Sequence, residues 1–221
     1  MNKKDEYIIE MNKARQILDS NSSKQERLEA IMELCYGCAL VAEENIKLNM
    51  EFDNAALMED FLVYAQEAEQ YNHLLEQIYN ICSRIEKTVV GHPRLMARFK
   101  RFYRQVVYRV ENAIYDGREL NLSSYLSEDI SELERNIYYA DKEQWQDIST
   151  IEHLKKDPIE WSEKYENVID EVEKELYEYF KDEPRGMGFC FGYWFKKREI
   201  LAQRGIEWKT PGEMNPKVRF D

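Results

Sequence analysis

The amino-acid sequence predicts an all-α protein, a single domain of residues 1–221 folded as a helical bundle of about six to eight helices. Glycine and proline are scarce, at 8 and 5 of 221 residues, and helix interiors disfavour both. Apolar residues recur at spacings of three and four, as one face of an α-helix requires. Apolar residues make up 43% of the chain, which is enough for a packed core and excludes general disorder.

The clearest periodicity runs through residues 55–87, where one apolar residue follows another at alternating spacings of four and three. The stripe consists of Leu57, Phe61, Tyr64, Ala68, Tyr71, Leu75, Ile78, Cys82 and Ile85. It predicts one long helix. A bundle helix is favoured over a coiled-coil seam, because Ala55, Leu62 and Ile81 widen the apolar face beyond two positions per heptad.

Local start and stop signals predict the remaining helices. A first helix is expected over 4–18, and the capping-box pattern of Ser23 and Glu26 begins a second. Pro93 begins a helix expected to run to about Tyr115 and to be ended by Gly117. Ser127 is expected to cap a helix over 128–147. Asp157-Pro158 begins a further helix that stops before Pro184. Thr210 and Glu213 can cap one more turn.

The C-terminal segment 185–221 differs in being rich in aromatic residues. Its large rings are Phe189, Phe191, Tyr193, Trp194, Phe195 and Trp208. Six rings represent a large apolar area, so we expect the segment to pack on the bundle and close its core. The alternative is an exposed patch that binds a partner or a second copy of the chain.

The cellular setting expected from the sequence is the cytoplasm. The N-terminus lacks an apolar signal region, and no apolar run is long enough to cross a bilayer. Cys35 and Cys38 form a C-x-x-C pattern, but it lies on the apolar face of a predicted helix rather than at a helix N-terminus. We therefore interpret these cysteines as packing residues and expect neither a metal site nor a cofactor.

Charge is distributed in alternating blocks. The net charge of −12 conceals an acidic block of −13 in residues 119–183, and two basic blocks of +5 in 92–118 and +4 in 184–221. A strongly acidic helical protein can cover a basic surface on another protein, and long-range attraction would speed that association. Inhibitor, immunity and adaptor proteins are of this type.

The Arg-rich helix 93–115 is the candidate binding site. Its basic residues are Arg94, Arg98, Lys100, Arg101, Arg104 and Arg109, and no acidic residue occurs between Pro93 and Val110. Arginine forks bind phosphate or carboxylate in bidentate fashion. Three interpretations stay open: internal ion pairs with an acidic neighbouring helix, a nucleic acid or phosphate ligand, and an acidic protein partner.

No motif identifies a catalytic residue. Glu160/Glu163 and Glu175/Glu178 have the E-x-x-E spacing of helical magnesium-dependent hydrolases, but a downstream E-x-x-D partner is missing. The leading hypothesis is therefore a non-enzymatic interaction protein that binds another macromolecule, most readily a protein. The alternatives are binding of nucleic acid or a phosphate ligand through the Arg-rich helix, and a magnesium-dependent helical hydrolase.

Overall fold

The fold is all-α, as the sequence predicts. A computed structural model describes residues 2–114, 122–149 and 153–220. This part of the chain is 76% helical and contains no strand; it has ten α-helices, of which eight span seven residues or more. Five short 3-10 helices accompany them: Glu51–Asp53, Asn72–Leu74, Glu86–Thr88, Trp145–Asp147 and Pro158–Trp161.

The chain divides into two compact units, each with its own hydrophobic core. The first comprises residues 1–90 and 95–130, and the second comprises residues 91–94 and 131–221. No buried residue is common to the two cores. The single-domain organisation expected from the sequence stays a prediction.

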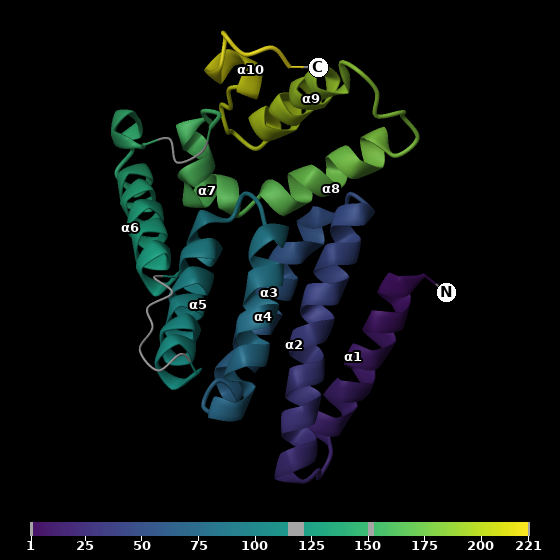
Figure 1. The fold of residues 1–221 in the computed structure, drawn as a ribbon. Coiled ribbons are helices and arrows are strands. Elements are labelled where there is room, and N and C mark those ends of the chain that lie inside the picture. The colour runs from purple at the N-terminus through teal and green to yellow at the C-terminus, as the bar shows by residue number, and fades with distance from the viewer. Residues whose placement is uncertain (1, 115–121, 150–152, 221) are drawn as a thin grey trace. The chain divides into compact units, whose positions relative to one another are not determined.

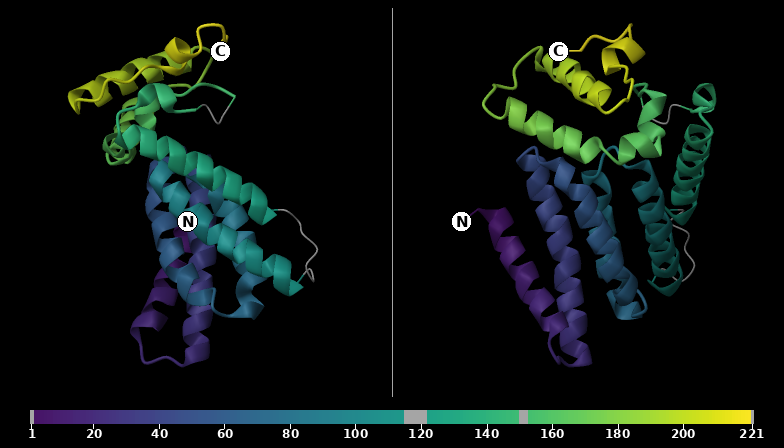
Figure 2. Two further views of the ribbon diagram at one scale, coloured as in Figure 1. Left: turned by 90° about the vertical axis from the view of Figure 1, so that its left-hand side faces the viewer. Right: turned by 180° about the vertical axis from the view of Figure 1, so that it is seen from behind.

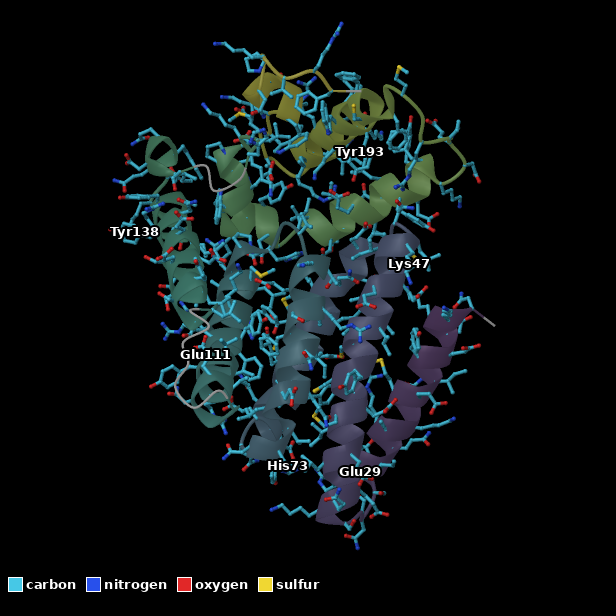
Figure 3. The ribbon with its side chains drawn as sticks, in the orientation of Figure 1. Glu29, Lys47, His73, Glu111, Tyr138 and Tyr193 are labelled. Atoms are coloured by element: carbon cyan, nitrogen blue, oxygen red, sulfur yellow. The ribbon has the colours of Figure 1, made fainter. Side chains whose placement is uncertain are left out.

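Long helices form the first unit (Figure 1). They are α1 (Lys3–Asp19), α2 (Lys24–Lys47), α3 (Asn54–Ala68), α4 (Leu75–Ile85) and most of α5 (Pro93–Ile114). The predicted capping box begins α2, where Ser23 Oγ accepts the amide of Glu26 and the Glu26 carboxylate accepts the amide of Ser23. Figure 3 labels Lys47 at one end of α2 and His73 in the turn between α3 and α4, toward the opposite end of α2.

The single helix expected over 55–87 is wrong, because the chain turns between α3 and α4. After Ala68, residues 69–74 form a turn and a short 3-10 helix before α4 begins. Arg109 of α5 donates to the carbonyl oxygen of Glu69 at 2.7 Å and to Asn72 Oδ1 at 2.8 Å, which satisfies groups that the break exposes. Both helices still bury their stripe in one core, so periodicity alone could not reveal the turn.

Aromatic rings join α5 to the other helices of the first core. The Phe61 ring of α3 lies 6.2 Å from the rings of Phe99 and Phe102, and Tyr79 of α4 lies 5.9 Å from Tyr103. All five rings are buried or packed against the core. The apolar face of the Arg-rich helix is therefore fixed inside the first unit, and its polar face is what remains for other contacts.

The helix that was expected over 128–147 begins earlier and ends earlier. Helix α6 runs from Leu122 to Asp141, and Ser127 is not its cap but donates to the carbonyl oxygen of Ser123 within it. The buried carboxylate of Glu111 accepts the amides of Leu122 and Ser123 and the Ser123 hydroxyl. The predicted helix end at Gly117 lies outside the described residues.

The second unit contains α7 (Glu163–Glu166), α8 (Ile169–Phe180), α9 (Phe189–Gln203) and α10 (Pro211–Met214). Helices α8 and α9 lie side by side in the views of Figure 2. Asp157 does cap a helix start, because its side chain accepts the amide of Ile159, but what begins there is the 3-10 helix Pro158–Trp161. The single helix expected from this start to before Pro184 is wrong, because the segment is divided into that 3-10 helix, α7 and α8. The capping box of Thr210 and Glu213 is likewise present at α10. The core consists of Tyr165, Ile169, Val172, Leu176, Phe180, Ile200, Leu201, Ile206 and Trp208.

Candidate interaction surfaces

Most of the basic side chains of α5 contact acidic groups of the same chain. Arg98 forms a bidentate pair with Glu59 of α3, at 2.6 and 2.9 Å. Arg94 pairs with Glu166 and Asp141 and donates to the carbonyl oxygen of Trp161. These contacts correspond to the internal ion pairs that the sequence left open as one interpretation.

Lys100 is the most enclosed cation of the helix. Its ammonium lies 3.2 Å from a Glu86 oxygen and 2.5 Å from an Asp129 oxygen, and the side chain is 15% exposed. Burial lowers the pKa of Lys100, but the hydrogen bond to Asp129 and the charge of Glu86 outweigh it, so the net shift is upward. Lys100 thus connects α5 to α6 and to the 3-10 helix after α4.

The remaining basic residues have different surroundings. Arg104 donates to the Ser127 hydroxyl at 3.1 Å. Arg109 holds the turn after α3 and lies 3.9 Å from the Glu69 carboxylate. Arg101 is exposed and lines an open cavity between α3 and α5. The six predicted residues therefore do not form one uncompensated anion-binding surface.

The other sequence motifs are also occupied by internal contacts. Cys35, Cys38 and Cys82 are buried, and burial raises the pKa of each thiol, that of Cys38 to about 12. Their placement fits packing residues. Of the E-x-x-E carboxylates, Glu160 accepts from Trp208, Glu175 pairs with Arg204, and Glu178 pairs with Lys181.

Helix α9 separates its aromatic residues onto two faces. Phe189 and Tyr193 face the second core, where both rings contact Phe180. The expected burial of all six rings is therefore only partly correct: Trp208 is buried, whereas Phe191 and Phe195 are 53% and 62% exposed. Residues 191 and 195 are one helical turn apart, so their rings share a side of the helix.

The exposed side of α9 is extended by two further rings. Phe191 lies edge-on to Trp194 at 5.5 Å, and Trp194 lies edge-on to Phe220 at 5.0 Å. We call Phe191, Trp194, Phe195 and Phe220 the α9 aromatic face. The guanidinium of Arg198 lies 5.8 Å from the Phe195 ring centroid and also pairs with Glu213 of α10.

A buried charged group holds the opposite side of α9 against α8. The Lys197 ammonium lies 2.6 Å from a Glu173 oxygen, and its other neighbours are the faces of Tyr165 and Trp208. The hydroxyl of Tyr193, a residue labelled in Figure 3, donates to the same carboxylate. Lys197 occupies the α9 position between Tyr193 and Leu201, so the core-facing side of the helix includes one fully paired cation.

Sequence reasoning counted the rings of the C-terminal segment but did not divide them by helical face. The signal was available, because Phe189, Tyr193 and Lys197 recur every four residues, and Phe191 and Phe195 repeat the same spacing two positions later. What the sequence did not contain was which of the two faces α8 would cover.

Comparisons with known proteins identify no relative of this chain. No protein-family model, curated protein or solved structure matches this chain. Within residues 2–114, 122–149 and 153–220, no helix is long and apolar enough to span a membrane. The same residues contain no cluster of three or more His, Cys, Asp or Glu side chains placed to hold a metal ion.

Proposed function

We infer that this chain is a non-enzymatic interaction protein that binds another protein through the α9 aromatic face. The observation that supports this is the exposure of Phe191 and Phe195 on one side of α9, where Phe191 also contacts Trp194 and Trp194 contacts Phe220. Covering the exposed parts of these two side chains would contribute on the order of 5 kcal/mol of gross transfer free energy. Aromatic anchors of this kind dominate the binding energy of protein interfaces.

The charges beside the face indicate the chemistry of the partner. Residues 184–221 contain eight Lys and Arg residues but four Asp and Glu residues, an excess of +4. Arg198 lies over Phe195, and Lys196 lies 4.8 Å from the ring of Tyr179. The partner that fits is a different protein presenting an apolar surface flanked by carboxylates. A symmetric pairing of two α9 faces would place equal positive charges opposite each other.

Protein is favoured over nucleic acid by the ion pairs. Binding to nucleic acid depends on cations that neutralise phosphates. On α5, Arg98 and Lys100 already pair with carboxylates of the same chain. The net charge of −12 also opposes the approach of a polyanion.

The test compares two doubly substituted full-length proteins. Phe191→Ser with Phe195→Ser removes the anchors, and Tyr108→Ser with Tyr125→Ser removes two rings of α5 and α6 that are equally exposed. Each protein is immobilised and challenged with source lysate, with and without nuclease, and each captured protein is then purified and titrated directly. We expect one partner to bind the wild type and the Tyr variant, and to bind the Phe variant at least tenfold more weakly.

Three results would contradict the proposal. One is a partner that binds both variants equally. Another is capture that disappears with nuclease and with Arg98→Glu, Arg101→Glu and Arg104→Glu together, which would favour the Arg-rich helix and nucleic acid. The third is a concentration-dependent dimer of the purified protein that the Phe variant abolishes, since that would make a second copy the occupant.

A further inference from the structure

Residues 216–220, which we call the tail, carry two cations beside the α9 aromatic face. Lys217 and Arg219 are exposed, and neither forms an ion pair with a described residue. The cations of α9 are already paired within the chain, Lys196 with Glu199, Lys197 with Glu173 and Arg198 with Glu213. Uncompensated positive charge next to the aromatic face therefore lies on the tail rather than on α9.

Contacts at both ends fix the tail in the second unit. Just before it, the Asn215 side chain accepts from the amide of Lys155 at 2.9 Å and donates to the carbonyl oxygen of Lys155 at 2.8 Å. At the other end, the Phe220 ring lies edge-on to Trp194 of α9. The Trp194 ring is also close to α10, since a Cβ at Gly212 would lie 3.5 Å from it. The tail thus has a defined position against α9.

A turn at the start of the tail presents the first cation. The amide of Val218 donates to the carbonyl oxygen of Asn215 at 3.0 Å, so residues 215–218 form a turn with Lys217 at a central position. Arg219 directly precedes Phe220, and the Cα atoms of consecutive residues are about 3.8 Å apart. Both long side chains can therefore reach a group that is bound against the Phe220 ring.

We propose that Lys217 and Arg219 recognise an acidic segment of the partner, whose apolar side chains lie on the α9 aromatic face and whose carboxylates lie beside the tail. This inference rests on the proposed function and names the groups that bind the partner's charges. An ammonium and a guanidinium both bind carboxylate. Charges more than about 8 Å apart are largely screened at physiological ionic strength, so these neighbouring cations outweigh the net charge of −12 for a short segment.

An acidic peptide segment fits this surface better than a single-stranded nucleic acid, which also binds through aromatic rings and cations. A nucleic acid carries a phosphate at every nucleotide, whereas the tail offers only Lys217 and Arg219. Glu171 of α8, and Asp182 and Glu183 of the loop that leads to α9, are exposed and form no ion pair with a described residue. These carboxylates oppose a continuous row of phosphates. A peptide needs negative charge only where it meets the tail.

The experiment measures the binding of labelled synthetic peptides to the full-length protein by fluorescence anisotropy. One peptide has leucine and tryptophan at its centre and glutamate at both ends, and a second has glutamine in place of each glutamate. We expect the acidic peptide to bind about fivefold more tightly than the glutamine peptide, as two exposed ion pairs predict. Raising the salt concentration should reduce this preference, because salt screens the pairs.

Three doubly substituted proteins test whether the preference comes from the tail. Lys217→Gln with Arg219→Gln should bind both peptides equally, whereas Lys217→Arg with Arg219→Lys keeps both charges and should keep the preference. The matched control Lys3→Gln with Lys87→Gln removes two exposed cations of the first unit that form no ion pair with a described residue, and it should keep the preference too. A thermal melt confirms that each protein is folded.

A fourth protein, Phe191→Ser with Phe195→Ser, separates this inference from the proposed function. It should bind both peptides more weakly by the same factor, and unchanged binding would contradict the α9 aromatic face as the site. A preference for glutamate that survives Lys217→Gln with Arg219→Gln would contradict the role of the tail alone. The inference is also overturned if the acidic peptide does not bind at about 1 mM, or if a single-stranded oligonucleotide binds the wild type more tightly than this peptide does.

Discussion

At the residue scale, two buried carboxylates form hydrogen bonds between separate parts of the chain. Glu111, which is labelled in Figure 3, is 7% exposed. Its carboxylate accepts hydrogen bonds from three donors at the described start of α6. An acidic group at a helix N-terminus also interacts favourably with the helix dipole. Glu160 is enclosed in the second unit and accepts from Trp208 Nε1 at 2.7 Å. Glu111 thus joins the consecutive helices α5 and α6, whereas Glu160 joins positions 48 residues apart in the sequence.

Glu160 makes stability depend on pH in a defined direction. Burial raises its pKa above the ordinary value of 4.5, although the hydrogen bond from Trp208 opposes that shift. The folded protein therefore binds the proton more tightly than the unfolded chain does. The free energy of unfolding then falls as pH rises from the unfolded pKa through the folded one.

We expect Glu160→Gln to remove this fall, because glutamine can accept from Trp208 without becoming charged. The stability of the variant relative to the wild type should increase with pH and then level off above the folded pKa. Urea unfolding at a series of pH values measures the difference, and Glu207→Gln, at an exposed position without a described contact, is the control. A difference that stays constant across the series would refute the prediction.

At the element scale, the packing between helices determines whether a glycine position has room for a side chain. A Cβ at Gly37 would lie 2.3 Å from Met11 Cγ, so α1 approaches α2 closely at this position. Gly192 of α9, in contrast, has no atom within 4 Å of the position of an added Cβ. Both glycines lie inside helices, where alanine is intrinsically preferred by about 1 kcal/mol.

The two glycines should therefore respond oppositely to alanine. Gly192→Ala should stabilise the protein by up to about 1 kcal/mol, since only the helix preference changes. Gly37→Ala should destabilise it by about 1–3 kcal/mol, because Met11 is buried and must move. Thermal or chemical unfolding measures both, and a stabilised Gly37→Ala protein would show that α1 adjusts freely.

The ion pairs of α5 are expected to contribute differently to the free energy of unfolding, because they differ in burial. Arg98 and Glu59 are both well exposed, whereas the side chain of Lys100 is mostly enclosed between two carboxylates. Arg98→Gln should cost less than about 1 kcal/mol, as exposed pairs do. Lys100→Gln should cost about 1–3 kcal/mol, because Glu86 and Asp129 lose their common partner.

Denaturant unfolding of these two variants checks the assignment of roles on α5. A larger effect for Lys100→Gln supports the view that the enclosed cation connects the elements of the first unit. If Arg98→Gln were the more destabilising change, the exposed pair with Glu59 would instead be the principal polar contact between α3 and α5.

Two separate cores define the organisation of the whole molecule. The first contains residues of α1 to α6 and the second contains residues of α7 to α9 and the segment after α9. Deleting residues 186–221 removes Ile200, Leu201, Ile206 and Trp208 from the second core and nothing from the first. The aromatic segment thus contributes to the second core, together with α7 and α8, and not to the first.

We expect that deletion to affect the two units unequally. Amide hydrogens of α8 should lose protection from exchange, because Leu176 and Phe180 become exposed, while α2 and α4 should keep theirs. Hydrogen exchange measured by mass spectrometry separates the two regions. An equal loss of protection in α2, α4 and α8 would mean that residues 1–221 fold as the single cooperative domain expected from the sequence.

The sequence by itself determined the helical class and several helix starts. These properties are local: capping at Ser23, Asp157 and Thr210 involves residues two or three positions apart, and periodicity is a property of one helix. The turn between α3 and α4 was missed for the same reason, because the stripe keeps its spacing across the turn.

Only the tertiary structure decided which groups meet. The partners of Arg94 and Arg98 lie 39 to 72 residues away, and no local pattern selects among 43 Asp and Glu residues. The same holds for α9, where the helical repeat places Phe191 and Phe195 on one side but cannot say that α8 covers the other. Exposure depends on long-range packing, and long-range packing left the α9 aromatic face exposed.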